Sequence, residues 1–248
     1  MEKIISSPLT YWGGKRWLVK TILDLIPEGT QEVFSPFLGG GSIEINLAYR
    51  GYKVHAYDNY QPLVNFWEHW LADPESVRLA VYELLSLYTN EDLNRLSYMH
   101  VDSHHHAAFY FCRSRLPYNG LPNRTMKFYL RNDGEIVRQL PCKGYPKGDT
   151  IFKYWEFWRD NPLSTLNVNH ADFEQVFWIH NHQFAYIDPP YFGLDKVYDG
   201  SRENGFNHEK LRELLGQREK WVLSYNDHPK ARELYRDYHI QLIQRTPG

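Results

Sequence analysis

The sequence has little cysteine and no long hydrophobic run. Only two cysteines, Cys112 and Cys142, occur among the 248 residues, and they do not form a Cys-x-x-Cys pair. This excludes a disulfide framework and a thiolate metal site, and we expect a reducing cytoplasm as the compartment. The first nine residues lack the basic stretch and apolar core of a secretory leader, and no run approaches the roughly 20 apolar residues that span a bilayer. We therefore expect no secretion and no membrane insertion.

An excess of positive charge is also missing. The formal net charge is −2, which taken alone argues against a nucleic-acid-binding protein. The average hides a contrast, because residues 113–153 hold nine basic and three acidic side chains, a net charge of +6, and the remaining residues carry −8. The chain is rich in aromatic residues, at 16%, and its mean hydropathy is −0.60. These values suit a soluble protein with one basic segment and many rings available for packing or stacking.

Strands and helices alternate at both ends of the chain. The expected elements are a helix over 16–26, a strand over 32–37, a helix from the glycines to about 50, strands over 53–57, 166–168 and 184–187, a helical piece over 173–179, a helix over 207–217, a strand over 221–224, a helix over 230–235 and a strand over 240–243. Such alternation is typical of a parallel sheet with crossover helices. We predict an α/β fold, a Rossmann-like domain made of residues 1–61 and 161–248.

The middle of the chain breaks this alternation. From Pro62 to about Arg115 the pattern is helical, whereas residues 117–148 are dominated by Gly, Pro, Asn and basic residues with only short β-like pieces. We predict that 62–160 form an inserted, mainly helical module. The run His104-His105-His106 lies in it, and because no second spaced set of ligands is evident, we interpret it as a helix surface and predict no metal site.

The most informative motif is Asp188-Pro189-Pro190-Tyr191, which follows the apolar run Phe184 to Ile187. Proline cannot donate to a sheet ladder, so the strand ends here and presents a carboxylate and an aromatic ring on a stiff edge. The Asp188 carboxylate and the Pro189 carbonyl can accept N–H protons from an exocyclic amine. The ring of Tyr191 offers a face on which an extruded base could stack. This combination favours methylation of a base amine.

A second motif points to an adenosine-like cofactor. The turn Phe37-Leu38-Gly39-Gly40-Gly41 follows the first predicted strand, and Asp58 ends the second strand 17 residues after Gly41. Glycines at such a turn let the backbone approach a ligand, and an acid at about this offset accepts ribose hydroxyls. A dinucleotide pattern would place glycine where Glu44 stands, next to a pyrophosphate. S-adenosylmethionine has no phosphate, and Lys15 in Tyr11-Trp12-Gly13-Gly14-Lys15 could pair with its carboxylate.

In this order the motifs resemble those of the Dam-like N6-adenine DNA methyltransferases, in which Gly-Gly-Lys precedes Phe-x-Gly-x-Gly and Asp-Pro-Pro-Tyr follows an inserted recognition region. The resemblance covers Pro8 to about Ile243. It implies transfer of a methyl group from S-adenosylmethionine to the N6 amine of adenine in duplex DNA, by base flipping. The cofactor residues that it implies are Tyr11, Lys15, Phe37, Gly39, Gly41, Asp58, Asp172 and Asp188, and the catalytic residues are Asp188, Pro189, Pro190 and Tyr191.

The resemblance also implies that the inserted region holds DNA, since Pro117-Tyr118-Asn119-Gly120 matches a Tyr-Asn-Gly element there. The predicted DNA contacts are Arg115, Tyr118, Asn119, Arg124, Lys127 and Arg131. The family's Phe-Asn-x-Pro-Phe-Gly stretch has no clear counterpart here, so the recognised sequence is not predicted. Family members continue past the position of Gly248 into a further edge strand, so we expect such a strand to be missing or to lie outside this sequence.

Two other functions remain open from the sequence. One keeps the enzyme but changes the acceptor to the N4 amine of cytosine or to RNA, although aspartate rather than serine before Pro-Pro favours adenine. The other is a DNA-binding relative with impaired catalysis. A cognate restriction endonuclease is a further expected partner, and the sequence predicts no oligomeric state.

Overall fold

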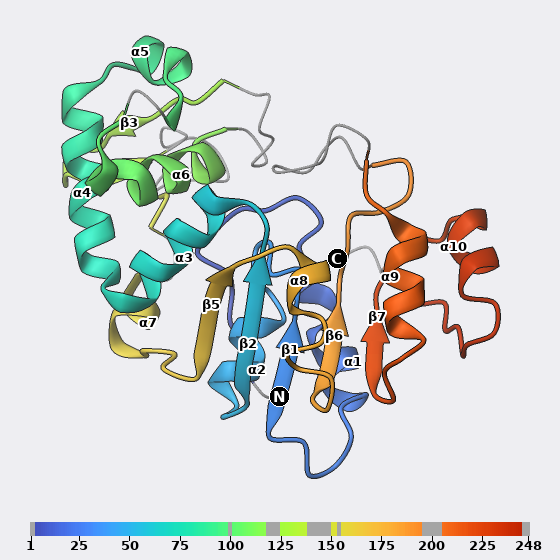
Figure 1. Ribbon diagram of the computed structural model, residues 1–248. Coiled ribbons are helices and arrows are strands. Elements are labelled where there is room, and N and C mark those ends of the chain that lie inside the picture. The colour runs from blue at the N-terminus through green and yellow to red at the C-terminus, as the bar shows by residue number, and fades with distance from the viewer. Residues whose placement is uncertain are drawn as a thin grey trace.

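The computed structural model describes residues 3–98, 101–117, 125–137, 150–152, 155–194 and 205–244. Its centre is a parallel sheet of five strands in the order β5-β2-β1-β6-β7 (Figure 1). The strands are β1 (Glu32–Ser35), β2 (Lys53–Asp58), β5 (Leu166–His170), β6 (Phe184–Ile187) and β7 (Trp221–Leu223). The predicted α/β fold with a parallel sheet is confirmed.

Alternating side chains of the central strands enter two separate cores. In β6, Phe184 and Tyr186 belong to one cluster, whereas Ala185 and Ile187 belong to the other. Because successive side chains in a strand point to opposite faces, a strand with four buried residues must be covered on both sides. The result is a sheet between two helical layers.

Short helices form the two layers. The first core includes residues of η1 (Arg16–Leu18), α1 (Val19–Asp24), α2 (Glu44–Tyr49) and α3 (Gln61–Ala72). The second core includes residues of α8 (Phe173–Val176), α9 (His208–Leu215) and α10 (Pro229–Leu234). Most predicted helices therefore exist, with ends a few residues shorter than the sequence pattern indicates.

Between β2 and β5 the chain is mainly helical, as predicted. After α3 come α4 (Pro74–Leu87), α5 (Asn90–Arg95), η3 (Ser103–His105), α6 (His106–Arg115), the two-stranded sheet of β3 (Tyr129–Leu130) and β4 (Ile136–Val137), and α7 (Trp155–Asp160). These elements lie on the β5 side of the main sheet (Figure 1). Their hydrophobic residues continue the first core, since α3 contacts both β5 and α6.

One predicted strand is wrong. Residues 240–243 form no strand, although Ile243 packs against the first core. Ile240 and Leu242 are exposed, at 49% and 58%, and a strand requires a hydrogen-bonding neighbour that this segment does not have among the described residues.

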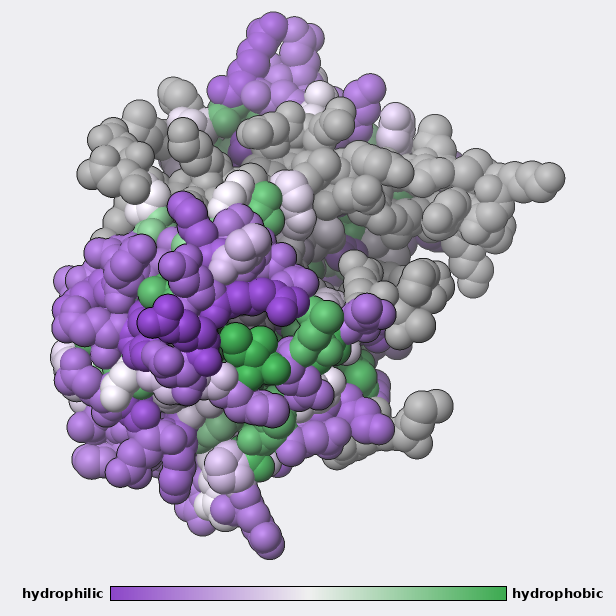
Figure 2. Space-filling model, turned by 90° about the vertical axis from the view of Figure 1, so that its right-hand side faces the viewer, coloured by the Kyte–Doolittle hydropathy of each residue, from purple (hydrophilic) through white to green (hydrophobic). Residues whose placement is uncertain are grey.

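The face of the molecule on the β7 side carries mainly hydrophilic residues, with a few hydrophobic ones near its centre (Figure 2). Among the described residues, no helix is both long and apolar enough to cross a membrane.

Candidate active site

A pocket opens at the carboxyl ends of β1, β2 and β6. Strand order reverses between β1 and β6, because the chain runs from β1 outward to β2 and β5 and later returns to β6 and β7. Ligands of open α/β sheets bind at such a switch point. The pocket encloses about 980 Å³ with its open mouth, and all eight predicted cofactor residues line it: Tyr11, Lys15, Phe37, Gly39, Gly41, Asp58, Asp172 and Asp188.

Asp188 sits directly beyond β6 and is held by two partners. Its Oδ2 lies 3.0 Å from Nζ of Lys15, and its Oδ1 accepts a hydrogen bond from the Ser224 hydroxyl at 2.7 Å. The Lys15 ammonium also lies 4.6 Å from the ring centroid of Tyr191 and donates to the carbonyl of Gly13. Pro189 and Pro190 line the pocket beside Asp188. The predicted catalytic edge is thus brought against the predicted cofactor residues.

Two aromatic side chains, Tyr11 and Trp67, pack against the glycine turn that follows β1. Gly39 and Gly41 adopt φ of 48° and 65°, and a Cβ on Gly40 would lie only 2.5 Å from Cβ of Tyr11. A Cβ on Gly41 would meet the ring of Trp67 at 2.7 Å, and the indole N–H of that tryptophan donates to the Gly39 carbonyl. Side chains at these positions would push Tyr11 and Trp67 away, so glycine is required for the turn to sit this close to its neighbours.

Asp58 is the last residue of β2, lines the pocket and is hydrogen-bonded to the glycine turn. Its two carboxylate oxygens accept hydrogen bonds from the backbone N–H groups of Gly39 at 2.9 Å and Tyr60 at 3.0 Å. Burial nevertheless raises the pKa of Asp58 to about 6. Each oxygen keeps a further lone pair, so the carboxylate can accept hydroxyl groups from a bound ligand.

Two features of the site are not predicted from the sequence, namely Ser224 beside Asp188 and an apolar wall of the pocket. Ser224 lies directly after β7, and its position as a polar residue at the carboxyl end of a predicted strand was the available signal. The second feature is an apolar wall in which the rings of Phe37, Phe173 and Phe206 lie with centroids 5.2 to 5.5 Å apart. The sequence shows no spacing that relates residues 37, 173 and 206, so only the fold could find this wall.

Glu44 was noted only as a departure from the dinucleotide pattern. It is buried, it lines the pocket, and its Oε1 accepts a hydrogen bond from the Ser35 hydroxyl at 2.6 Å. Burial is the main cause that raises the pKa of Glu44 to about 7, and the negative charge of Asp188 adds to it. With Asp58, Asp172 and Asp188, the pocket holds four carboxyl groups and one lysine. It therefore suits a ligand that carries positive charge.

The predicted DNA contacts are only partly within the described residues, since Tyr118, Asn119 and Arg124 lie outside them. Lys127 is exposed just before β3, and Arg131 pairs with Asp133 after that strand. Arg115 points inward, where its guanidinium donates to the Ile151 carbonyl at 3.0 Å and to the Thr10 hydroxyl at 3.1 Å. This places Arg115 in contact with the segment that leads to Tyr11.

The parallel sheet and the pocket at its switch point define a Rossmann-like fold. Residues 11–246 match the family described as D12 class N6 adenine-specific DNA methyltransferase. The chain therefore belongs to this family, and the recognised resemblance and adenine-specific DNA methylation are confirmed.

Two curated relatives agree with this assignment. Type II methyltransferase M1.LlaDCHI of Lactococcus lactis subsp. cremoris is 27% identical over 275 aligned residues, which cover 99% of this chain and 90% of the relative. Modification methylase StsI of Streptococcus sanguinis is 25% identical over 221 residues, which cover 81% of this chain and 31% of the relative. DNA is thus the substrate class of the family to which the chain belongs.

Proposed function

We propose that the pocket binds S-adenosylmethionine and that the enzyme methylates the N6 amine of an adenine flipped out of duplex DNA. When bound, this cofactor supplies an electrophilic methyl group on a sulfonium. The observation that carries the proposal is the position of Asp188, the first residue of the catalytic edge, which lies 3.0 Å from Lys15 in the pocket that the glycine turn also lines.

The donors and surfaces of the pocket fit this cofactor. Asp58 would accept the ribose hydroxyls with lone pairs that its backbone partners leave open. The wall of Phe37, Phe173 and Phe206 would pack on the adenine, with Asp172 at its side. The four carboxyl groups suit a sulfonium and an ammonium, whose positive charge favours the ionised carboxylates, whereas Lys15 is the one cationic side chain among the described residues that line the pocket and a pyrophosphate would need more.

Lys15 would have two partners in turn. In this structure it pairs with Asp188 Oδ2, the oxygen that an amine would need. Lys15 would instead hold the carboxylate at the methionine end of the cofactor, since its ammonium donors are not fixed in direction. Asp188 would then have Oδ2 available for the target base.

With Oδ2 free, Asp188 and the Pro189 carbonyl would accept the N–H groups of the adenine amine while Tyr191 stacks on the base. Ser224 would hold Asp188 through Oδ1. The main contribution is alignment, for which well-oriented groups supply roughly 7 to 11 kcal/mol.

We assign DNA recognition to the inserted module, residues 62–160, and the chemistry to residues 1–61 and 161–248. The net charge of +6 over residues 113–153 supports this division, because phosphate contacts need Lys and Arg. Lys127 and Arg131 are the proposed contacts within the described residues, and Tyr118, Asn119 and Arg124 are proposed outside them. Arg115 was predicted as a contact too, but its guanidinium is engaged by the Ile151 carbonyl and the Thr10 hydroxyl, so we do not propose it as a DNA contact. The names of the relatives, a type II methyltransferase and a modification methylase, support a cognate restriction endonuclease as a partner that cleaves the unmethylated site in the cytoplasm.

The variant Asp188→Ala tests the catalytic assignment. We expect methyl transfer to fall by at least about 100-fold, since both the acceptor of the amine protons and its alignment are lost. DNA affinity should be unchanged in a gel-shift assay. Asp227→Ala, which removes an exposed aspartate paired with Arg232, is the matched control and should retain wild-type activity. A fully active Asp188→Ala enzyme would overturn the assignment.

A further inference from the structure

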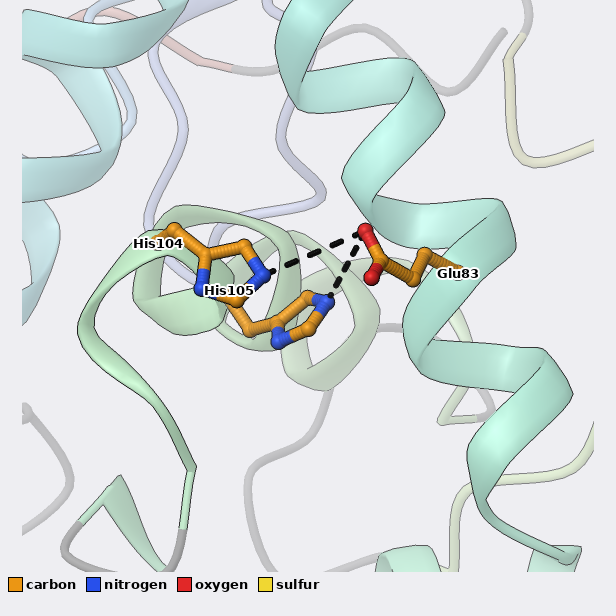
Figure 3. Close-up of side chains that lie close together, drawn as sticks. All are labelled: Glu83, His104 and His105. Carbon is orange, nitrogen blue, oxygen red and sulfur yellow. Dashed lines mark ion pairs between the residues drawn. The ribbon is translucent and has the colours of Figure 1, made fainter.

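A group of metal-ligand side chains lies in the inserted module, away from the pocket. Glu83 is on α4, and His104 and His105 are on η3, the short turn that leads into α6. Figure 3 shows both imidazole rings pointing toward the Glu83 carboxylate. The third histidine of the run, His106, is not part of the group, because its Nε2 lies 2.9 Å from the Val101 carbonyl.

The distances fit one shared cation. Nε2 of His105 lies 3.4 Å and Nε2 of His104 lies 3.9 Å from Oε2 of Glu83, and the three ligand atoms are all within 4.8 Å of one another. Zinc bonds of about 2.0 to 2.2 Å in a tetrahedral site place neighbouring ligand atoms about 3.3 to 3.5 Å apart. Small side-chain rotations of the two exposed residues, Glu83 and His104, would close the remaining difference.

His105 supplies an independent reason to expect a ligand. Its side chain is only 4% exposed, and its Nε2 is buried without a hydrogen-bond partner among the described residues. A buried polar atom is normally satisfied, and an imidazole nitrogen aimed at a carboxylate and a second imidazole is satisfied by a metal ion.

We propose that Glu83, His104 and His105 bind a zinc-class divalent cation. Two histidines and one glutamate are a ligand set that zinc accepts, with water completing the tetrahedron. From the sequence alone we predict no metal site, because no second ligand set is adjacent to the histidine run. The fold supplies the further ligand, since Glu83 is 21 residues before His104 in the sequence and α4 packs against both η3 and α6. The bound ion fastens α4 to the start of α6 and so stiffens the inserted module.

The test is Co²⁺ binding to the full chain without a histidine tag, followed by visible absorption, because Co²⁺ reports its coordination geometry and substitutes for Zn²⁺. Wild type should bind one Co²⁺ with a tetrahedral spectrum that Zn²⁺ abolishes. Glu83→Gln and His104→Gln, which change exposed side chains and should fold normally, should each weaken binding by about tenfold or more. The matched control His182→Gln removes an exposed histidine elsewhere and should bind as wild type does.

Thermal unfolding provides a second readout. Zn²⁺ should raise Tm in wild type and in His182→Gln, since the ligands come together only in the folded chain, and should not raise it in Glu83→Gln. Absence of Co²⁺ binding by wild type, or equal affinity in all four proteins, would overturn the proposal. Neither readout depends on methyl transfer, so failure here is distinct from failure of the proposed function.

Discussion

At the scale of single residues, the pocket holds two carboxyl groups whose ionisation is disfavoured in the folded protein. Burial raises the pKa of Glu44 to about 7 and that of Asp58 to about 6. A folded-state pKa above the unfolded value means that the folded protein binds the proton more tightly. The resulting stability is present at pH below the unfolded pKa and is lost as the pH rises through the folded pKa. For these two groups the loss falls between about pH 4 and pH 7.

The variant Glu44→Gln tests this coupling. The shift of Glu44 from 4.5 to about 7 corresponds to roughly 3 kcal/mol of unfolding free energy lost with rising pH. Glutamine keeps the acceptor for Ser35 and cannot ionise, so the variant should lose less stability than wild type between pH 5 and pH 7.5. Urea denaturation at several pH values measures this. The control Glu28→Gln, at an exposed position, should keep the wild-type slope, and an equal slope in Glu44→Gln would contradict the account.

Ser224 is expected to act by positioning Asp188. The variant Ser224→Ala removes the hydrogen bond to Oδ1, and we expect kcat to fall about 10-fold with little change in KM for S-adenosylmethionine. Stability should fall by about 1 kcal/mol, since Tyr186 also loses a partner 3.2 Å away. A stability loss without any change in kcat would show that the role is structural only.

The sequence predicted the contacts that motifs carry and missed those that the fold creates. Lys15, Asp58 and Asp188 each follow or precede a recognisable glycine turn or strand end, and the structure brings them into one pocket. Ser224 and Phe206 come from elements with no motif of their own. Their roles depend on which strand neighbours β6 and which loop covers β1, and residue spacing does not encode either.

At the scale of elements, the turn that precedes β6 depends on one buried arginine. Arg218, between α9 and β7, donates to the carbonyls of Phe177, His180 and Gln183 at 2.6 to 3.1 Å, and burial lowers its pKa to about 10. The planar guanidinium can satisfy three carbonyls at once because its donors form a fixed fork. This contact fixes the entry to β6 and therefore the position of Asp188 at its end.

Replacing Arg218 with methionine should leave these carbonyls without their donor. We expect Arg218→Met to lower the free energy of unfolding by about 3 kcal/mol, because each unsatisfied buried group costs about 1 to 3 kcal/mol and water partly compensates. Urea unfolding of the variant measures the loss. Arg236→Met, at an exposed arginine, should change stability by less than about 0.5 kcal/mol, and the same small effect in Arg218→Met would refute the role of this contact.

At this scale, helices and strands could be predicted where burial gives the sequence a local pattern. They could not be predicted where a strand depends on pairing with a distant segment. The strand β6 and the helix α4 were predictable because an unbroken apolar run and a helical residue pattern follow from the layers that cover these elements. Residues 240–243 have the composition of a strand, but strand formation requires a partner elsewhere in the chain. The sequence pattern cannot supply that partner.

At the scale of the whole molecule, positive charge is concentrated in one segment of the inserted module, residues 113–153. Residues 113–153 carry +6 and the other residues −8. Duplex DNA would be attracted to this basic segment and repelled by the remaining residues, so the enzyme would approach DNA in one orientation. The overall net charge of −2 conceals this arrangement, whereas a count of charged residues along the chain reveals it.

The salt dependence of DNA binding tests the orientation. Lys127→Ala should weaken binding to all duplex sequences alike and reduce the slope of log K against log salt by about 1, as expected for the loss of one phosphate contact. Fluorescence anisotropy over a salt series provides the slope. Lys220→Ala, an exposed lysine next to β7, is the matched control and should leave the slope unchanged. Equal slopes for wild type and Lys127→Ala would exclude the proposed contact.

The central claim is that this pocket delivers a methyl group to adenine in DNA. The most direct measurement incubates the enzyme with tritium-labelled S-adenosylmethionine and unmethylated duplex DNA and then separates the nucleosides of the product. We predict label in N6-methyladenine and in no other nucleoside. Label in N4-methylcytosine, or no transfer to DNA despite cofactor binding, would contradict the account.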